Sequence, residues 1–494
     1  MNTKTTLAIL VLAIVLAVLG IMKFRSGATP AAHSESADTA RPLLDATRFN
    51  TSDVTAIDLE RASDDAPFRF EKGDNDAWKQ TAPIPFDMEG WQIEGLATDA
   101  AGLKVYQTIT PSQLTGDLSL DTLSFNPPAA SLTFSMKDGS PVNLELGRMS
   151  LAGKAYARLD PAGDVFLVDD TLHKRVLQRD PREWRVRSIF SDRDSDPAQV
   201  SIQDHDAQSS LVISRVDSRW RMLQPVSTHL DPQAVDRFVN TLQSASIRGW
   251  VVDAPDSLTL YGLDNPARTI SLRIDKVQPD SSVQSTSQTL LVGSPIDLTD
   301  KSRYAKRGER KDVFTISGPS IDQLNPKVET LISKSVLPVA PAEIRALDVK
   351  GQGGSFRLER TTDSWSLRKE GRDAQPADPE VVEHFLTLLT TPRNALSLGS
   401  LPADGPEAAM AEVAVEDFNN ARIAFIRIAQ VKSDPQPPST QNPSILTSYD
   451  AGDGVLRTDS ADTLPALNPD AYVVEDAAPS PADPSAPAAP EPSK

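Results

Sequence analysis

The sequence predicts an α+β protein in which an N-terminal transmembrane helix precedes three tandem domains, each a mainly antiparallel sheet with one packed helix. Three observations predict this class. The chain opens with an uncharged apolar run. A unit of alternating strands and one amphipathic helix then recurs about every 140 residues. That period is too long for a solenoid and long enough for each copy to bury its own core.

The composition excludes several function classes. The chain has 494 residues, a net charge of -18 and no cysteine. Contacts with phosphates need a basic surface, so neither nucleic acid nor anionic lipid headgroups are expected partners. The absence of cysteine excludes disulfide scaffolds, thiol catalysis, Cys-type zinc sites and a lipidated N-terminal cysteine.

The first segment is predicted to anchor the chain in a membrane through residues 7–22. The run Leu7–Met22 carries no charge, and Lys4, Lys23 and Arg25 flank it. A cleaved signal peptide is the alternative, but its small-residue site should follow the apolar run directly, and here two basic residues come first. The flanking charges are nearly balanced. We expect a single-pass anchor in the inner (cytoplasmic) membrane, with the rest of the chain in the periplasm, because single N-terminal anchors most often have that layout.

Composition shifts and the repeat divide the chain into six predicted segments. A small, polar linker follows the anchor, and the final stretch is too rich in proline and alanine to build a core. The segments are residues 1–25 (anchor), 26–50 (linker), 51–193, 194–343 and 344–475 (repeat domains, the third divergent) and 476–494 (disordered tail).

In the first copy, apolar and polar residues alternate in strands that are joined by polar turns. The expected strands are Val54–Arg61, Phe68–Gly73 and Trp78–Pro83, then a hairpin over Ala129–Gly147 that turns at Asp138–Gly139, and a second hairpin over Ala155–Asp170. A helix is expected from about Asp87 to Val105, although Gly90 and Gly95 interrupt it. A short helix near Thr171–Leu177 closes the copy.

The second copy is the clearest. Asp231 can cap a helix in which proline takes the first position, and Phe238 lies on its apolar face. The turn cluster Tyr261–Pro266 follows, with Gly262 at its centre. The remaining expected elements are strands at Val200–Asp204, Leu211–Val216, Thr269–Asp275 and Thr289–Gly293, a hairpin over Ser302–Ser317 and a short helix at Ser320–Leu324.

The third copy is more divergent. Asp378 is expected to start a helix whose apolar face includes Phe385, and in the second and third copies the aspartate precedes this phenylalanine by seven residues. Trp220 lies 142 residues after Trp78, and Trp365 lies 145 after Trp220. The other expected elements of the third copy are strands within Ile344–Gly351 and Phe356–Gly371, hairpins over Ala411–Gln430 and Ser444–Ser460, and a short helix in the place of Thr463–Asn468.

The repeated unit resembles the domain of unknown function 4340 (DUF4340) family of bacterial membrane-anchored proteins. The resemblance covers about residues 54–339 and fades in the third copy. The residues that carry this structural signature are Trp78, Trp220, Trp365, Asp231, Asp378, Phe238, Phe385, Tyr261, Gly262 and Pro266. The strand ends Leu146–Gly147 and Val292–Gly293 also match. The family is often found beside ABC-2-type transporter genes of the gliding-motility kind, which implies an exported accessory subunit and no known chemistry.

No motif predicts catalysis, a cofactor or a metal. The five histidines lack metal-ligand spacing, and no nucleophile elbow or phosphate loop is present. The run Asp192–Asp196 resembles the start of a calcium loop, but Pro197 stands where the loop needs glycine and Gln203 where it needs glutamate. We therefore expect no enzyme and no cofactor.

One basic run stands out in the acidic chain: it contains Arg179, Arg182, Arg185 and Arg187. It is either a patch that docks an acidic partner or the next domain, or a solvated helix end and connector. The recurring tryptophans are likewise either carbohydrate-stacking residues or core anchors, and the latter is favoured.

The predicted function is a non-enzymatic, membrane-anchored extracytoplasmic scaffold or accessory subunit of an envelope complex, with an ABC-type transporter (permease and ATPase) as the first candidate. The alternative is an envelope protein that binds polysaccharide or peptide in grooves between domains. A hydrolase would need a pair of carboxylates that converge in one pocket from different copies.

Overall fold

The computed structural model describes residues 41–474, except 151, 192–195, 217, 297–298, 300, 309, 363, 405–407 and 433–444. The predicted anchor, most of the linker, the calcium-like aspartates up to Asp194 and the tail from 476 lie outside the described residues. Within residues 41–474, no helix combines the length and the apolar character that a membrane crossing requires.

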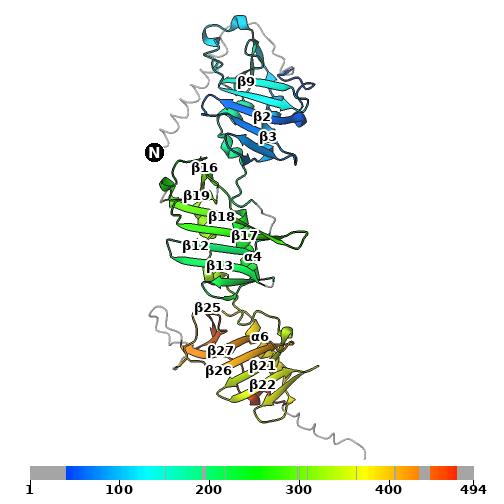
Figure 1. Cartoon of the computed structure of the whole chain (residues 1–494), viewed down its shortest axis with the longest axis vertical. Helices are drawn as coiled ribbons and strands as arrows, with labels where there is room; N and C mark the ends of the chain where they lie inside the picture. Colours follow the sequence, from blue (N-terminus) through cyan, green and yellow to red (C-terminus); the bar gives the residue numbers. More distant parts are fainter. Residues whose placement is uncertain are drawn as a thin grey trace, which may run out of the picture. The chain divides into compact units, whose positions relative to one another are not determined.

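Three nine-stranded sheets with one common strand order make up most of the described chain (Figure 1). Their orders are β5-β4-β3-β2-β8-β9-β10-β11-β7, β15-β14-β13-β12-β17-β18-β19-β20-β16 and β24-β23-β22-β21-β26-β27-β28-β29-β25. All of the ladders are antiparallel, so the α+β class with mainly antiparallel sheet and the threefold recurrence are confirmed. In each copy four strands form a meander. One helix then leads the chain to the opposite edge of the sheet, where it forms the edge strand (β7, β16 or β25), and four more strands follow.

The first copy contains the following strands and helices: β2 (Val54–Arg61), β3 (Phe68–Lys72), β4 (Trp78–Ala82), β5 (Phe86–Asp87), α2 (Gly90–Ala101), β7 (Gln107–Ile109), β8 (Ala130–Met136), β9 (Pro141–Met149), β10 (Lys154–Arg158), β11 (Val165–Asp169) and α3 (Thr171–Leu177). The short strands β1 (Arg41–Pro42) and β6 (Lys104–Val105) pair with each other.

The second copy contains β12 (Gln199–Asp204), β13 (Ser209–Val216), β14 (Arg219–Gln224), β15 (Thr228–His229), α4 (Pro232–Ser244), β16 (Gly249–Val252), β17 (Arg268–Val277), β18 (Val283–Pro295), β19 (Arg303–Arg307), β20 (Val313–Ile316) and α5 (Gly318–Gln323). The third contains β21 (Ile344–Gly351), β22 (Gly354–Arg360), β23 (Trp365–Lys369), β24 (Gln375–Pro376), α6 (Pro379–Thr390), β25 (Ala395–Leu398), β26 (Ala411–Asp417), β27 (Arg422–Lys432), β28 (Ile445–Asp450) and β29 (Val455–Ser460).

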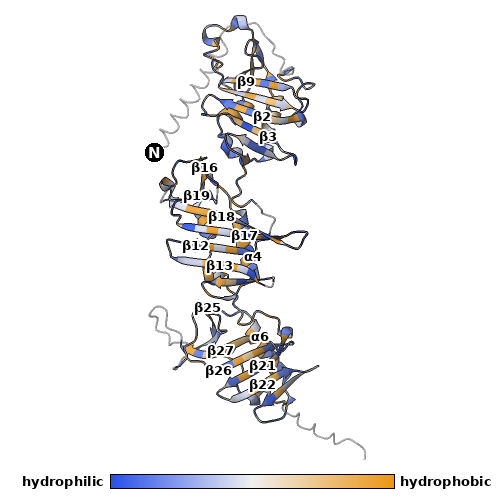
Figure 2. Cartoon of the chain, viewed as in Figure 1, coloured by the Kyte–Doolittle hydropathy of each residue, from blue (hydrophilic) through white to orange (hydrophobic). Residues whose placement is uncertain are grey.

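Alternation along the strands places one face of each sheet against its helix, as the banded colours of Figure 2 show. In β8 every second residue is buried. In the second copy, the apolar face of α4, with Val235, Phe238 and Leu242, packs into one cluster with the inward side chains of β12, β13 and β17. This burial is the main driving force for each sheet to hold its helix.

The chain divides into two compact units, residues 1–186 and 187–494. The first unit holds the first sheet. The second unit holds the second and third sheets together. The predicted domain boundary at 343/344 therefore lies inside one compact unit and stays a prediction.

Three details differ from the sequence-based expectations. Helix α2 is shorter than 87–105, because it ends at Ala101 and the chain then enters β6. The short helix expected at 463–468 is replaced by a single 3-10 turn at Ala461–Thr463, since Pro465 lacks the backbone N–H that a longer helix would need. The edge strands β5, β7, β15, β16, β24 and β25 were not expected, because segments of two to four residues are too short to show alternation.

Candidate functional site

The recurring tryptophans are core anchors. Trp78 and Trp365 are 3% exposed and Trp220 is 9% exposed, and each lies at or near the start of the third strand of its sheet. Arg215 covers the ring of Trp220 at 5.0 Å, and a second arginine covers Trp365 at 4.6 Å. These indoles offer little surface on which a sugar ring could stack.

The capping residues and the repeated phenylalanine also stabilise the fold. The carboxylate of Asp231 accepts hydrogen bonds from two backbone N–H groups at the start of α4, and Asp378 accepts one at the start of α6. Phe238 and Phe385 are buried under their sheets. The predicted helix starts are confirmed, and the two buried phenylalanines are not available to a ligand.

Two of the motifs that carry the resemblance contact each other. In the second copy, Gly293 of the Leu-x-Gly strand end lies directly under the Tyr-Gly turn: a Cβ atom at Gly293 would lie 2.1 Å from the carbonyl oxygen of Tyr261. Gly262 adopts a positive φ of 64° in the turn, which favours glycine. In the first copy a Cβ atom at Gly147 would lie 2.4 Å from the Leu123 carbonyl oxygen, so a different turn sequence packs in the same way.

The third copy has lost this close contact. By strand register, Ala429 occupies the position of Gly147 and Gly293. Ala429 is fully buried, so the turn near Leu401 leaves room for a methyl group. The glycine is therefore required by the turn that packs on it and not by the strand itself.

A buried ion pair occurs at matching positions in the first and third sheets with the charges exchanged. Arg158 of β10 pairs with Glu145 of β9. At the corresponding positions Asp450 of β28 pairs with Arg427 of β27. In both copies the arginine also donates to a backbone carbonyl of the turn that follows the helix, at 3.3 Å to Phe125 and 3.0 Å to Leu401.

Exchanging this pair in the first sheet is expected to be tolerated where a single change is not. Arg158→Asp alone places two carboxylates together in a buried site and should lower the free energy of unfolding by about 3 kcal/mol or more. The double variant Glu145→Arg/Arg158→Asp should recover more than half of that loss, since the third sheet holds the exchanged pair. Urea unfolding of both variants measures this. A double variant as unstable as the single one would contradict the equivalence of the two sites.

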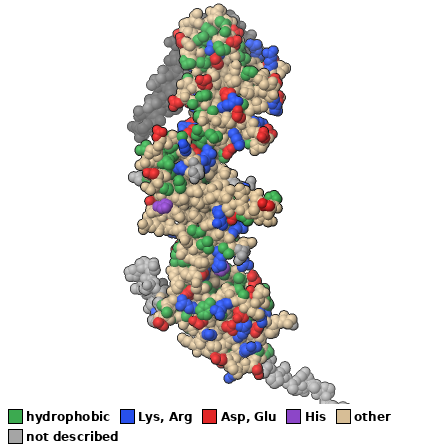
Figure 3. Space-filling view, in the orientation of Figure 1, with side chains coloured by type: hydrophobic (Ala, Val, Ile, Leu, Met, Phe, Trp, Pro, Cys, Tyr) green, Lys and Arg blue, Asp and Glu red, His purple; other side chains and the backbone are tan. Residues whose placement is uncertain are grey.

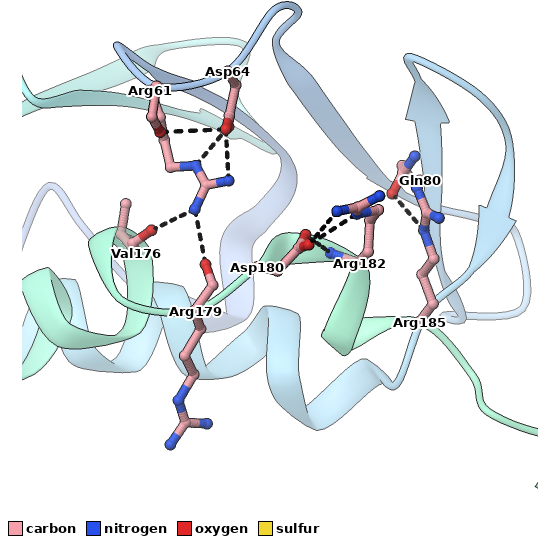
Figure 4. A network of polar contacts seen from close by, with 9 residues as sticks. Arg61, Asp64, Gln80, Val176, Arg179, Asp180, Arg182 and Arg185 are labelled. Carbon is pink, nitrogen blue, oxygen red and sulfur yellow. Dashed lines mark hydrogen bonds and ion pairs between the residues drawn. The ribbon is translucent and has the colours of Figure 1, made fainter. Parts of the chain in front are cut away.

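The basic run does not form one exposed patch (Figure 4). Arg185 is fully buried, donates to Gln80 at 3.3 Å and covers the ring of Phe86 at 3.8 Å. The docking-patch interpretation is therefore wrong for this residue, because a cation held inside the first unit cannot meet a partner. Arg182 forms an ion pair with Asp180 of its own turn.

The other two arginines of the run lie in different surroundings. The side chain of Arg179 is exposed, while its carbonyl oxygen accepts a hydrogen bond of 2.8 Å from Arg61, which also binds the Val176 carbonyl and so caps the end of α3. Arg187 belongs to the second unit, where it donates to the carbonyl oxygen of Arg248 at 2.7 Å. Within the described residues, the run is mainly structural.

The second unit contains a buried polar junction between its two sheets. Arg457 of β29 is 1% exposed, and its side chain extends from the third copy to residues of the second copy and of the connector. It donates to the backbone carbonyl of Ser333 at 3.0 Å, to the hydroxyl of Thr228 at 3.2 Å and to the carboxylate of Asp453 at 2.8 Å. Thr228 in turn donates to Asp453. Val455 joins the apolar core of the second copy, so side chains of the third sheet complete that core.

The electrostatics of the junction favour an ionised Asp453. Burial by itself raises the pKa of this carboxyl, but the hydrogen bond and charge of Arg457, with the bond from Thr228, outweigh it and hold the pKa below the ordinary value. A lowered pKa contributes stability that is present above the unfolded-state pKa and is lost as the pH falls through the folded-state pKa.

Acid is therefore expected to weaken the junction. The stability that Asp453 contributes should be intact at neutral pH and should disappear as the pH falls below about 4. Urea unfolding of the natural chain and of Asp453→Asn at a series of pH values measures it. The stability difference between the two should shrink in acid, and a difference that stays constant down to about pH 3 would contradict the ion pair.

A groove of about 790 Å³ opens beside this junction, within the second unit. Side chains of β14, β15, α4 and the connector to the third copy line it, among them Arg219, Trp220, His229, Asp236 and Lys334. Burial, followed by the charge of Arg221, lowers the pKa of His229, so this histidine is neutral at pH 7. The groove combines exposed cations with the carboxylates of Asp231 and Asp236 and an indole edge.

In the part of the chain that the structure describes, no three His, Asp or Glu side chains are grouped so that they could hold a metal ion. Asp196, the last of the calcium-like aspartates, forms an ion pair with Arg215 at 2.6 Å.

The fold and its signature residues define a class of protein: a tandem array of one nine-stranded α+β unit whose recurring residues cap, anchor and close the unit. The chain belongs to the family described as "Domain of unknown function (DUF4340)", whose model matches residues 78–266 and 220–395. The two matches begin at Trp78 and Trp220, which are the same position in successive copies. No curated protein and no solved structure matches the chain.

Proposed function

We propose that the chain is a non-enzymatic scaffold or accessory subunit of an envelope complex, anchored in the inner membrane by residues 7–22 and exposed on the extracytoplasmic side. An ABC-type transporter, made of a permease and an ATPase, is the first candidate for this complex. The gene neighbourhood that the family resemblance implies is one motive for it.

The observation that carries the proposal is that the three copies keep their core, while the outer face of the second copy differs from those of the first and third. On the first sheet, Arg69 lies between the carboxylates of Asp58 and Glu71, at 2.7 and 2.6 Å. On the third sheet, Arg357 pairs at the corresponding position with Asp348 and also with Glu416.

The second sheet has an uncharged pair, Ser201 and Val212, at the same place. In Figure 3 the surface over β12, β17 and β18 is mostly uncharged. A unit that retains its interior and varies one exposed face is typical of a protein that presents different surfaces to several partners.

Immunoprecipitation of the tagged full chain from crosslinked membranes tests the proposal. We expect a permease and an ATPase to be recovered with it. A matched variant, Arg357→Glu, places a carboxylate where three others surround it and should reduce recovery without loss of the first sheet. Recovery of no transporter or envelope subunit would rule the proposal out.

The groove beside the junction supports a second candidate function, an envelope protein that binds polysaccharide or peptide between its domains. Its cations, Arg219 and Lys334, and the indole edge of Trp220 are the groups that would contact such a ligand. Arg219→Glu and Lys334→Glu should then abolish retention on immobilised envelope polysaccharide or peptide, whereas Lys276→Glu, outside the groove, should not. Equal retention by all three variants would contradict this candidate.

A further inference from the structure

Strands β17 and β18 extend beyond their neighbours as a two-stranded ribbon, which projects from the second sheet in Figure 1. Strand β12 pairs with β17 only as far as Arg273, and β19 pairs with β18 only from Leu290 onwards. The ladder between β17 and β18 nevertheless continues to the pair Val277–Val283. Residues 283–288 thus pair with β17 on one side, and no strand of the described chain pairs with them on the other.

This free edge lacks the usual protection against pairing. Exposed edges normally carry charges, proline or bulges, because their unpaired N–H and C=O groups can bind another strand. From Val283 to Gly293 the chain has neither a charged residue nor a proline. The other strand of the ribbon carries Asp275 and Lys276.

The corresponding edges of the other two sheets are guarded. Strand β9 begins with Pro141, and β27 begins with Arg422. The uncharged edge is therefore particular to the second copy. Residues 283–287 of this edge are exposed, and Val283 is 60% exposed. An exposed and uncharged strand edge can bind the backbone of another extended chain through its unpaired N–H and C=O groups.

The sequence of the edge indicates which chain would bind. Residues 284–288 read Gln-Ser-Thr-Ser-Gln, which is the same in both directions about Thr286. When two copies of one strand pair antiparallel around a twofold axis at Thr286, identical side chains lie opposite each other. The resulting pairs are Thr286 with Thr286, Ser285 with Ser287 and Gln284 with Gln288. The pairing ends before Thr289, whose carbonyl oxygen already accepts a hydrogen bond from the backbone of Gly308. Cross-strand pairs of Thr and Ser hydroxyls are stabilising.

We infer that the chain self-associates through this edge: the β18 strands of two copies pair antiparallel about Thr286 and join the two second sheets. The existing contacts of the glutamines are compatible with this. Gln284 accepts a hydrogen bond from Gln278 at 3.0 Å, and Gln288 accepts one from the backbone of Ser191 at 2.9 Å. Neither bond uses the glutamine's own amide nitrogen, which can donate across the pair. The inference does not depend on the proposed function.

Because the chain has no cysteine, single introduced cysteines report this pairing directly. In the full-length chain in membranes, Thr286→Cys should form a disulfide-linked dimer under a mild oxidant. Directly opposed residues lie at Cα distances that a disulfide spans. The matched control is Ser281→Cys, which is exposed in the turn of the same ribbon. We expect cross-linking at least about tenfold faster at position 286, because pairing raises the effective concentration of the two thiols.

The register gives a sharper test. A mixture of Gln284→Cys and Gln288→Cys chains should cross-link faster than either variant alone, since only the mixed pair is directly opposed. Position 286 cross-linking no faster than position 281, or cross-links from position 286 to a different protein, would overturn the inference.

Charge variants test the same contact without oxidation. Thr286→Lys and Thr286→Glu should each weaken self-association by about tenfold, because the twofold axis puts like charges opposite each other, and mixing the two variants should restore it. Sedimentation of the full chain in detergent measures this, and an unchanged thermal unfolding curve shows that the sheet is intact. A natural chain that stays monomeric, or charge variants that associate as the natural chain does, would contradict the pairing.

Discussion

Replacing Arg457 with methionine is expected to lower the free energy of unfolding of the second unit by about 3–5 kcal/mol, the usual cost of removing one partner of a buried ion pair. Arg457 is 1% exposed and holds the backbone of Ser333, the hydroxyl of Thr228 and the carboxylate of Asp453 together. Without it, the carboxyl of Asp453 loses its cation in a site that is mostly closed to water. Urea unfolding followed by tryptophan fluorescence measures the loss.

Two matched variants make this result specific. Arg219→Met removes an arginine whose side chain is 64% exposed and lies 3.9 Å from Glu343, and it should change stability by less than about 1 kcal/mol. Arg457→Met combined with Asp453→Leu should recover much of the loss, because replacing both members of a buried pair by apolar residues is often nearly neutral. A loss below about 1 kcal/mol for Arg457→Met would mean that the two sheets do not depend on this junction.

Replacing Gly293 with alanine is expected to destabilise the second copy by about 3 kcal/mol, near the upper end of the cost of overpacking. The new Cβ would lie 2.1 Å from the Tyr261 carbonyl oxygen and 3.1 Å from that of Gly262. Both are backbone atoms, so no side-chain rotation relieves the clash, and strand and turn must separate. Thermal or urea unfolding of the variant measures the effect.

Gly308→Ala is the control for this prediction. Its nearest neighbours, atoms of Thr289, would lie 3.8 Å or more from the new methyl group, so the change should stay within about 0.5 kcal/mol. Equal stabilities for the Gly293 and Gly308 variants would contradict the claim that Gly293 is required by the contact between the turn and the strand end.

Much of the fold could be predicted from the sequence because its local signals agree with one another. The caps Asp231 and Asp378 and the tryptophan spacing identified the copies, and alternation located the long strands. The short edge strands were not predictable, because they are defined by their pairing partners and not by their own residues. Ala429 shows a similar limit: nothing in its sequence neighbourhood indicates that it replaces a glycine.

The candidate site was less accessible to sequence reasoning. The charges of the basic run are close together in sequence and therefore suggested a docking patch. In the structure, Arg185 is buried and Arg182 forms an ion pair with Asp180 of its own turn. The junction between the second and third sheets was not predicted, because Thr228 and Arg457 lie 229 residues apart in the sequence. No spacing rule connects them. A single arginine in a hairpin strand gives no local signal that it will be buried against another copy.

Photo-crosslinking from the outer sheet faces, in native membranes, tests whether the chain is a subunit of an envelope complex. A photoreactive residue would be placed at Thr133, Ser271 or Ala414, which lie on the outer faces of the first, second and third sheets. We expect adducts with membrane-complex subunits, and a permease or ATPase of the ABC type among them, from at least one face. Adducts with no envelope or transporter subunit from any of the three faces would contradict this expectation.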